Sequence, residues 1–483
     1  MNFKMIFHTI GQVLIVLSAM LLLPLIVSLI YVEWMSVIAF SVTAVSSFAV
    51  GMLLSALSAT KRSAIYAREG LIIVSLAWIV VSLVGSVPFV ISGDIPSFTD
   101  AFFETVSGFT TTGATILTDV EHLTHGMLFW RSFTHWIGGM GVLVFAVAIV
   151  SRTPDRSMHI LKAEMPGPIV DKLVPRAKDT AKILYIIYIG LTVLLMILLL
   201  CGGMPFFDSV VHAFGTAGTG GFGIKNNSIA GYNHYLQWVI AIFMMLFGVN
   251  FNVYYLILIK KFKTAFGSRE LWIYIATILA CTALICVNMY SSFSNIADLI
   301  RASFFSVSSV MTTTGFTIAD FTQWGHLSKT ILIILMFVGG CAGSTAGGLK
   351  LTRVIILIKK MGNELKRIIH PRAATIVKFE GKRVDDDTLH GVSTYLAIYI
   401  VSFAIILFII SFEQSFSFEA NFTAVASCFN NIGPIFDNAA GGGTFVNYSV
   451  FSKLLLSFSM LLGRLEIYPL LLTIVPYTWM KNK

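Results

Sequence analysis

The chain has 483 residues, of which 56% are hydrophobic and only 12% are charged. About a quarter of the residues of a soluble domain are charged, so this composition excludes a water-soluble fold and predicts a polytopic membrane protein. The net charge of +9 does not indicate a nucleic-acid-binding protein, because the basic residues cluster in connectors between apolar runs.

Ten apolar segments are long enough to cross a hydrocarbon core of about 30 Å as helices. The first is too long for the core of a signal peptide, so we expect it to be retained. An even number of spans returns the chain to the side on which it began. The ten segments lie at about 9–31, 36–58, 70–91, 127–150, 181–202, 235–259, 271–290, 328–358, 391–412 and 450–478.

All but six of the 33 Lys and Arg residues lie near the termini or in four segments, at roughly 61–68, 152–182, 260–269 and 350–383. Basic loops stay in the cytoplasm, so we expect both termini and these segments on the inner side. The connectors 152–182 and 359–383 are also candidates for binding anionic lipid or a soluble partner. Equally, they could serve only to fix the topology.

Four apolar stretches of 12 to 15 residues remain, near 97–109, 205–217, 297–311 and 416–429. They are too short to span a membrane, and their length suits re-entrant half-helices. Each is followed at once by a short motif that ends in glycine, and these glycines are 108, 94 and 118 residues apart. The motifs are Thr110, Thr111, Thr112, Gly113; Gly218, Thr219, Gly220, Gly221; Thr312, Thr313, Thr314, Gly315; and Asn430, Asn431, Ile432, Gly433.

The four motifs predict an ion path lined by backbone carbonyl groups. Irregular backbone at membrane depth is tolerated only where it is buried in protein or lines an aqueous path. Carbonyl oxygens can replace the hydration shell of a monovalent cation, and glycine leaves room for them to face one axis. The half-helices would point their partly negative C-terminal ends at this axis. The alternative is that Thr and Gly only allow close helix packing, which is less plausible for four motifs in register.

A glycine-rich segment interrupts the eighth span, and a charge lies inside the tenth. The glycines disfavour a continuous helix, which indicates an ion path or a moving element, although a packing face of small residues is the alternative. Arg464 is expected to face a cavity or a partner; pairing with Glu466 or snorkelling are the alternatives. The residues that we single out in the eighth span are Gly339, Gly340, Gly343, Ser344, Thr345, Gly347 and Gly348.

With these motifs the chain resembles the Trk/Ktr/HKT superfamily of potassium transporters, and most closely its TrkH-type membrane subunits. The resemblance implies two leading helices and four units of span, pore helix, filter and span around a pseudo-fourfold pore. It implies that the filter residues bind the potassium ion through backbone carbonyls and that the four closing glycines favour potassium over sodium. The fourth motif departs from the threonine-rich pattern of the family.

The resemblance also implies roles outside the filter. The glycine-rich segment would be an intramembrane gate, and Arg464 a barrier in the pore that contacts the gate. The protein would be a homodimer in the inner membrane of a bacterium, controlled by a cytoplasmic RCK-type nucleotide-binding subunit, with no organic cofactor on this chain. The expected units are residues 1–65 (leading helices), 66–152, 153–265, 266–385 and 386–483 (pore repeats).

Other function classes have less support in the sequence. A sodium- or proton-coupled potassium symporter is the main alternative, with Glu466 as the candidate proton carrier. The residues from Gly218 to Gly223 match a dinucleotide-binding pattern but follow a membrane half-helix and lie in no βαβ unit. Because no catalytic or metal-ligating group of residues is apparent, we do not expect an enzyme.

Overall fold

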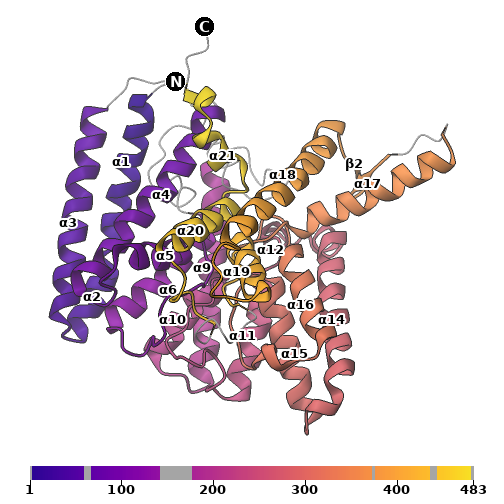
Figure 1. The fold of residues 1–483 in the computed structure, drawn as a ribbon, viewed down its shortest axis with the longest axis horizontal. Coiled ribbons are helices and arrows are strands. Elements are labelled where there is room, and N and C mark those ends of the chain that lie inside the picture. The colour runs from indigo at the N-terminus through magenta and orange to yellow at the C-terminus, as the bar shows by residue number, and fades with distance from the viewer. Residues whose placement is uncertain (1–2, 59–66, 142–176, 372–375, 436–442, 480–483) are drawn as a thin grey trace.

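The computed structural model describes residues 3–58, 67–141, 177–371, 376–435 and 443–479 (Figure 1). Within these ranges the chain is almost entirely helical, and the one sheet is a hairpin of two short strands. Six helices are long and apolar enough to span a membrane, or seven if one bent pair is counted as a span. The predicted all-α polytopic membrane class is confirmed.

The leading helices form a tightly packed antiparallel pair, α1 with α3, joined through α2. Gly11 and Gly51 allow this approach, because a Cβ atom on either glycine would lie within 2.8 Å of the carbonyl oxygen of the other. Small residues permit such close contact between membrane helices. These helices are α1 (Phe3–Met20), α2 (Leu22–Ile30) and α3 (Trp34–Leu57).

Four repeats follow, each with a first helix, a half-helix, a loop and a second helix. The half-helices α5, α10, α15 and α19 begin and end within two residues of their predicted bounds. The repeats contain α4 (Ala67–Ser92), α5 (Phe98–Phe109) and α6 (His125–Gly139); α9 (Ala177–Cys201), α10 (Phe206–Ala217), α11 (His234–Phe247), α12 (Phe251–Leu258) and α13 (Phe262–Ala265); α14 (Arg269–Met289), η1 (Tyr290–Ser292), α15 (Ile296–Met311), η2 (Phe321–Gln323), α16 (His326–Val338), α17 (Leu351–Ile369), β1 (Lys378–Phe379) and β2 (Lys382–Arg383); and α18 (Asp386–Ile410), α19 (Phe418–Asn430), α20 (Val450–Arg464), α21 (Tyr468–Ile474) and η4 (Pro476–Trp479).

Local sequence signals set the starts of the half-helices. The side chains of Ser97, Asn295 and Ser417 cap α5, α15 and α19 by accepting a hydrogen bond from a backbone N–H of the first turn. All four half-helices also carry an acidic residue in that turn, where it interacts favourably with the helix dipole. These residues are Asp100, Asp208, Asp298 and Glu419.

The second helices differ from the sequence prediction, which expected a break only in the eighth span. In the structure α6 ends at Gly139, α11 and α12 are bent by 91°, a loop separates α16 from α17, and α20 ends at Arg464. The helix after each loop therefore runs for only 13 to 15 residues. Glycines at or next to each break explain these ends, since glycine weakens a helix by up to about 1 kcal/mol relative to alanine.

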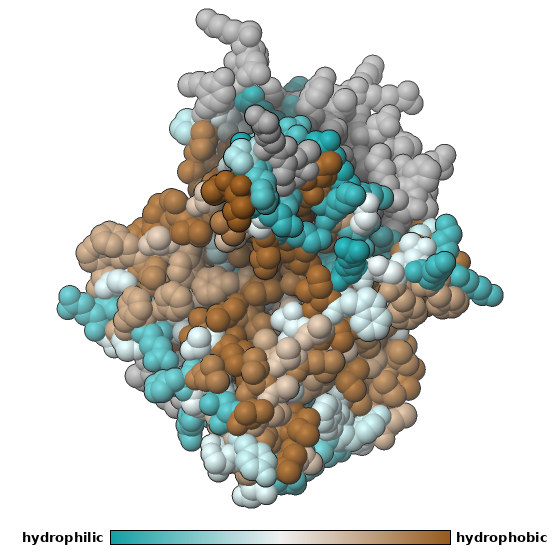
Figure 2. Space-filling model, turned by 90° about the vertical axis from the view of Figure 1, so that its right-hand side faces the viewer, coloured by the Kyte–Doolittle hydropathy of each residue, from teal (hydrophilic) through white to brown (hydrophobic). Residues whose placement is uncertain are grey.

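The outer surface is suited to a lipid environment. Figure 2 shows apolar side chains across the middle of one face, with hydrophilic residues gathered toward its ends. Large apolar side chains such as Val45 on α3, Val287 on α14 and Phe408 on α18 are each at least 68% exposed. The first and last described helices meet on one side of the molecule, where the rings of Phe3 and Trp479 stack at 6.2 Å.

Candidate functional site

The four motif loops have the same backbone conformation at the ends of their half-helices. We call them the first (110–113), second (218–221), third (312–315) and fourth (430–433) loops. In each, the third residue donates its backbone N–H to the carbonyl group five residues earlier, at 2.8 to 2.9 Å. This is the bond of a Schellman helix end, which needs a left-handed residue just before it. The donor residues are Thr112, Gly220, Thr314 and Ile432.

The left-handed residue is Thr in three loops and Asn in the fourth. Thr111, Thr219, Thr313 and Asn431 have φ between 53° and 58°. Such values are rare for a β-branched residue and cost about 1–3 kcal/mol, so the surrounding structure must impose them. The closing glycines also have positive φ, from 78° to 108°. The second and the fourth residue of every loop thus share a positive φ.

The loops meet in a closed ring. A Cβ atom on Gly113 would overlap the carbonyl oxygen of Gly220, one on Gly221 that of Thr314, and one on Gly315 that of Ile432. The ring closes because a Cβ atom on Gly433 would lie 2.7 Å from the carbonyl oxygen of Thr112. We call the carbonyl oxygens of Thr112, Gly220, Thr314 and Ile432 the carbonyl ring. Only glycine allows each loop to approach the next this closely.

Side chains of the loops hold the backbone from behind. The hydroxyl groups of Thr110 and Thr112 lie 2.8 Å apart, as do those of Thr312 and Thr314. In the fourth loop Asn431 replaces this pairing by donating to the Thr112 hydroxyl of the first loop, at 2.9 Å. Asn430 accepts a hydrogen bond from the Tyr399 hydroxyl. These two asparagine contacts hold the fourth loop in the same backbone conformation as the other three, although its sequence differs.

All four closing glycines line one cavity of about 220 Å³; we call this side of the carbonyl ring the outer side and the opposite side the inner side. Hydrogen bonds connect neighbouring repeats around it, among them Val120 N–H to Asn226 at 2.8 Å and Ile229 N–H to the Thr317 carbonyl at 3.1 Å. Hydrogen bonds from Asn226 and from the Glu121 amide lower the pKa of Asp119 below its usual value. The outer mouth is therefore polar and well ordered by hydrogen bonds.

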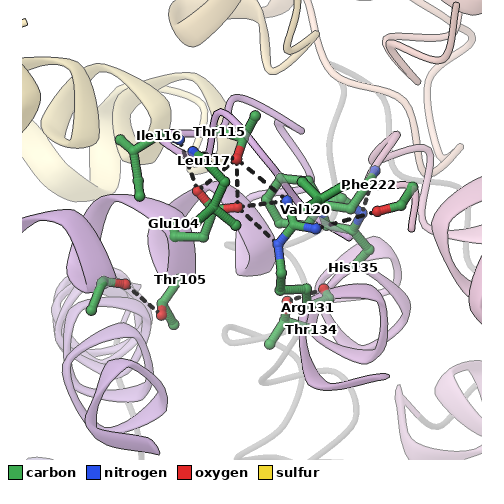
Figure 3. A network of polar contacts seen from close by, with 12 residues as sticks. Glu104, Thr105, Thr115, Ile116, Leu117, Val120, Arg131, Thr134, His135 and Phe222 are labelled. Atoms are coloured by element: carbon green, nitrogen blue, oxygen red, sulfur yellow. Dashed lines mark hydrogen bonds and ion pairs between the residues drawn. The ribbon is translucent and has the colours of Figure 1, made fainter. Parts of the chain in front are cut away.

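A buried ion pair lies beside the first and second loops (Figure 3). Arg131 on α6 donates from two nitrogens to one oxygen of Glu104 on α5, at 2.7 and 2.9 Å. The Thr115 hydroxyl and the Ile116 N–H, just after the first loop, also donate to this carboxylate. On the other side the guanidinium group lies 4.0 Å from the ring centre of Phe222, just after the second loop.

The glycine-rich loop, residues 339–350, lies against the inner side of the carbonyl ring. The Gly347 N–H donates to the Thr313 hydroxyl of the third loop at 2.6 Å. A Cβ atom on Gly347 would be 2.5 Å from the Asn430 carbonyl oxygen, so the contact with the fourth loop is equally close. Four of the seven residues that we singled out here, among them Ser344 and Gly348, line a cavity of about 60 Å³ together with Arg464.

Other helices hold the glycine-rich loop from the side. The Cys341 N–H donates to the Gly248 carbonyl at the bend between α11 and α12, at 3.0 Å. The carboxylate of Glu270, in the first turn of α14, accepts from the Ala342 N–H at 2.9 Å and from the Thr352 hydroxyl. Glu270 directly precedes the predicted span 271–290 and follows a basic segment, so no local signal in the sequence marked it for a buried polar role.

Arg464 connects the glycine-rich loop to the first repeat. Its guanidinium group donates to the Thr345 carbonyl at 2.9 Å and to the carbonyls of Gly138 and Gly139, at 2.6 and 2.9 Å. Glu466, which the sequence offered as an alternative partner, instead forms an ion pair with Arg353. The predicted contact between Arg464 and this loop is therefore present.

Comparisons with known proteins agree with this architecture. A family model for TrkH, described as a cation transport protein, matches residues 36–275 and 262–479. The chain is 35% identical to the Trk system potassium uptake protein TrkH of Salmonella typhimurium, covering 99% of this chain and all of that protein. It is 34% identical to TrkG of Escherichia coli over 99% and 98% of the two chains. The crystal structure of the potassium transporter TrkH from Vibrio parahaemolyticus superposes with a TM-score of 0.89 at 30% identity, covering 99% of this chain and all of that one.

Proposed function

Because this chain belongs to the TrkH family of cation transport proteins, we propose that it takes up potassium through the carbonyl ring. The observation that carries this proposal is that the four loops form a closed ring. The closing glycine of each loop packs against a carbonyl oxygen of the neighbouring loop. Carbonyl oxygens of four loops that face one axis can replace the water shell of a monovalent cation. The relatives that are named potassium uptake proteins favour potassium as this cation.

The test is uptake of radioactive rubidium into liposomes that contain the purified chain. We expect uptake that is driven by a voltage alone, competed by potassium and only weakly by sodium. Equal competition by sodium would contradict the proposed selectivity. Uptake that requires a sodium or proton gradient would favour the alternative, a coupled symporter. In that mechanism Glu466, here paired with Arg353, would have to exchange its proton.

We propose that the glycine-rich loop is the gate of this path and that Arg464 is a barrier below the carbonyl ring. Support comes from the bond between Gly347 and Thr313, because a loop that is bonded to the inner side of the ring obstructs the path. The positive charge of Arg464 at the adjoining cavity would repel a cation there. Disulfide trapping between introduced cysteines at Ala346 and Leu465 should block uptake reversibly, and unaltered uptake in the trapped protein would contradict the gate.

We also propose that the termini and the hairpin of β1 and β2 face the cytoplasm of a bacterium, where a nucleotide-binding ring of the RCK type controls the gate. Lys378, Lys382 and Arg383 of the hairpin are exposed, and basic segments favour the inner side. Most of the second basic connector, 152–182, lies outside the described residues. Reversing the three hairpin charges to Glu should reduce the response of uptake to the purified ring protein; an unchanged response would contradict this docking site.

A homodimer is the assembly that we propose for the membrane subunit. Helix α17 extends away from the rest of the chain (Figure 1), and its apolar side chains at spacings of three and four residues are at least 62% exposed. Such a stripe is typical of a helix that pairs with another helix. It comprises Ile358, Met361, Leu365 and Ile368. A Leu365→Glu variant should shift the detergent-solubilised protein from dimer to monomer, and an unchanged mass would contradict this interface.

A further inference from the structure

We propose that Glu104 and Arg131 are positioning residues that set the discrimination between potassium and sodium by holding the first and second loops at a fixed separation. This inference rests on the proposed role of the carbonyl ring. Both side chains are almost fully buried, at 0% and 2% exposure, and they lie 2.7 Å apart. No other ion pair among the described residues has both members buried to this degree.

The pair connects the chain segments that leave the two loops. Glu104 accepts hydrogen bonds from the Thr115 hydroxyl at 2.9 and 3.0 Å and from the Ile116 N–H at 3.0 Å. Arg131 donates to the Gly223 carbonyl at 3.3 Å and stacks on Phe222. Thr115 follows Gly113 by two residues, and Gly223 follows Gly221 by two. The same ion pair therefore holds both loops just beyond their closing glycines.

Helix α6 supports this connection along one face. One turn after Arg131, the ring of His135 stacks on Phe222 at 4.2 Å, and a Cβ atom on Gly220 would overlap the imidazole. At the next turn, a Cβ atom on Gly138 would overlap the carbonyl oxygen of Phe109, directly before the first loop. Because α6 contacts both loops at successive turns, a shift of Arg131 would move two of the four carbonyl groups relative to each other.

The pair belongs to the first repeat alone. Glu104 lies nine residues before its closing glycine, and the corresponding residues in the other repeats are His212, Ser306 and Ala424. Arg131 also lines the outer cavity, where an unpaired positive charge would repel an entering cation. The Glu104 carboxylate neutralises it, so an arginine can position the loops at the cation entrance without closing it electrostatically.

The test measures the ratio of rubidium to sodium permeability in liposomes for Glu104→Gln and Arg131→Lys. Glu104→Gln leaves the arginine charge unpaired, and Arg131→Lys keeps the charge but loses the two-nitrogen contact. We expect the ratio to fall about tenfold in both variants, equivalent to about 1.4 kcal/mol. If the ion pair served only in folding, the variants would accumulate to a lower level, but the folded protein would keep the wild-type ratio of rubidium to sodium permeability.

Matched variants separate the possible outcomes. Asp298→Asn removes an ion pair in the first turns of the half-helix α15, at the end opposite its motif loop, so its ratio should equal that of the wild type. If Glu104→Gln does not accumulate, Thr115→Val, which removes a hydroxyl donor to Glu104 and changes no charge, should still lower the ratio. A wild-type ratio in Arg131→Lys and Thr115→Val would overturn the inference.

One further variant tests the carbonyl ring independently. Gly113→Ser places a side chain against the Gly220 carbonyl oxygen, so it should reduce the ratio whether or not the ion pair matters. A reduced ratio in Gly113→Ser together with unchanged ratios in the ion-pair variants would refute the positioning role and leave the proposed function standing. An unchanged ratio in Gly113→Ser would refute the proposed function itself.

Discussion

The outer and inner layers of the candidate pore differ in symmetry. In the outer layer, four loops of unlike sequence have one backbone conformation, with the same helix-end hydrogen bond and the same contact with the next loop. In the inner layer, the four second helices break in different ways, and among the described residues only the third repeat places a glycine-rich loop against the ring. The four repeats thus share one backbone geometry in the outer layer and differ from one another in the inner layer.

This difference agrees with two distinct physical demands. Coordinating a cation evenly from several sides requires equivalent carbonyl groups, so the loops cannot diverge in backbone. A gate requires two arrangements of similar free energy, and one mobile element is enough to close a path. The inner contacts of Thr313, Glu270 and Arg464 are accordingly single contacts with the glycine-rich loop, and not a set repeated around the pore. Four predictions test how separate the two layers are.

The largest effect is expected from Gly315→Ala in the outer layer. Its φ of 85° disfavours alanine, and the new Cβ atom would overlap the Ile432 carbonyl oxygen. Left-handed backbone costs a residue with a Cβ about 1–2 kcal/mol, before any overlap is counted. We expect loss of potassium-selective rubidium uptake. Gly190→Ala is the control, because a Cβ atom there meets no atom within 4 Å; equal uptake by the two variants would show that the ring tolerates asymmetry.

The second prediction concerns the inner layer. Arg464→Ala removes a positive charge and three hydrogen bonds that join the glycine-rich loop to α6. Hydrogen bonds to charged groups contribute about 1.5–3 kcal/mol, so the closed arrangement should lose stability and flux should rise about tenfold. The rubidium-to-sodium ratio should stay that of the wild type. Arg301→Ala, on the half-helix α15, is the control. If the flux of Arg464→Ala is no higher than that of Arg301→Ala, the result contradicts a barrier at Arg464.

A smaller effect is expected where the two layers touch. Thr313→Val removes the acceptor of the Gly347 N–H, and leaving a buried donor unpaired costs about 1–3 kcal/mol. We expect a several-fold rise in flux at constant selectivity. Thr111→Val is a matched control, since it alters the equivalent residue of the first loop, whose hydroxyl has no hydrogen-bond partner among the described residues. Equal effects of the two substitutions would mean that this contact does not hold the gate.

Segment length and local composition were sufficient to predict the four half-helices and the positions of the loops that follow them. Length separated the half-helices from the spans, and the recurring glycines marked the loops whose contacts form the carbonyl ring. The fourth loop shows the limit of this reasoning, because Asn431 has the left-handed conformation of Thr111 with a different side chain. The residue types of the fourth motif alone could not show that its loop has the same backbone conformation as the other three. The boundaries of the four repeats stay predictions.

The inner layer was harder to predict because its contacts join residues far apart in sequence. Gly139, Gly248 and Gly463 lie at helix breaks and could have indicated them, but single glycines also occur in continuous helices. Glu270 lies 72 residues before Ala342, which donates to it, and no local pattern connects the two. The partner of Arg131 is likewise 27 residues away on another helix. Such pairings depend on how helices pack, which periodicity does not specify.

The smallest effect is expected at the inner surface, from Glu380→Gln in the turn between β1 and β2. The Glu380 carboxylate accepts from the Ser268 hydroxyl and from the N–H groups of Arg269 and Glu270, at 3.0 to 3.2 Å, and so caps α14 from outside. An exposed charge at a helix N-terminus contributes about 0.3–1 kcal/mol, so flux should change less than in Thr313→Val.

The direction of that change is the informative part. Glu270 in the capped turn holds the glycine-rich loop at Ala342, so weakening the cap should loosen the gate and raise flux, with the rubidium-to-sodium ratio unchanged. Glu364→Gln removes an exposed ion pair with Arg367 on α17 and leaves the cap of α14 in place, so it should leave flux unaltered. If Glu380→Gln behaves like this control, the hairpin does not communicate with the gate through α14. If it lowers selectivity, the two layers are not mechanically separate, because a change at the inner surface would then reach the carbonyl ring.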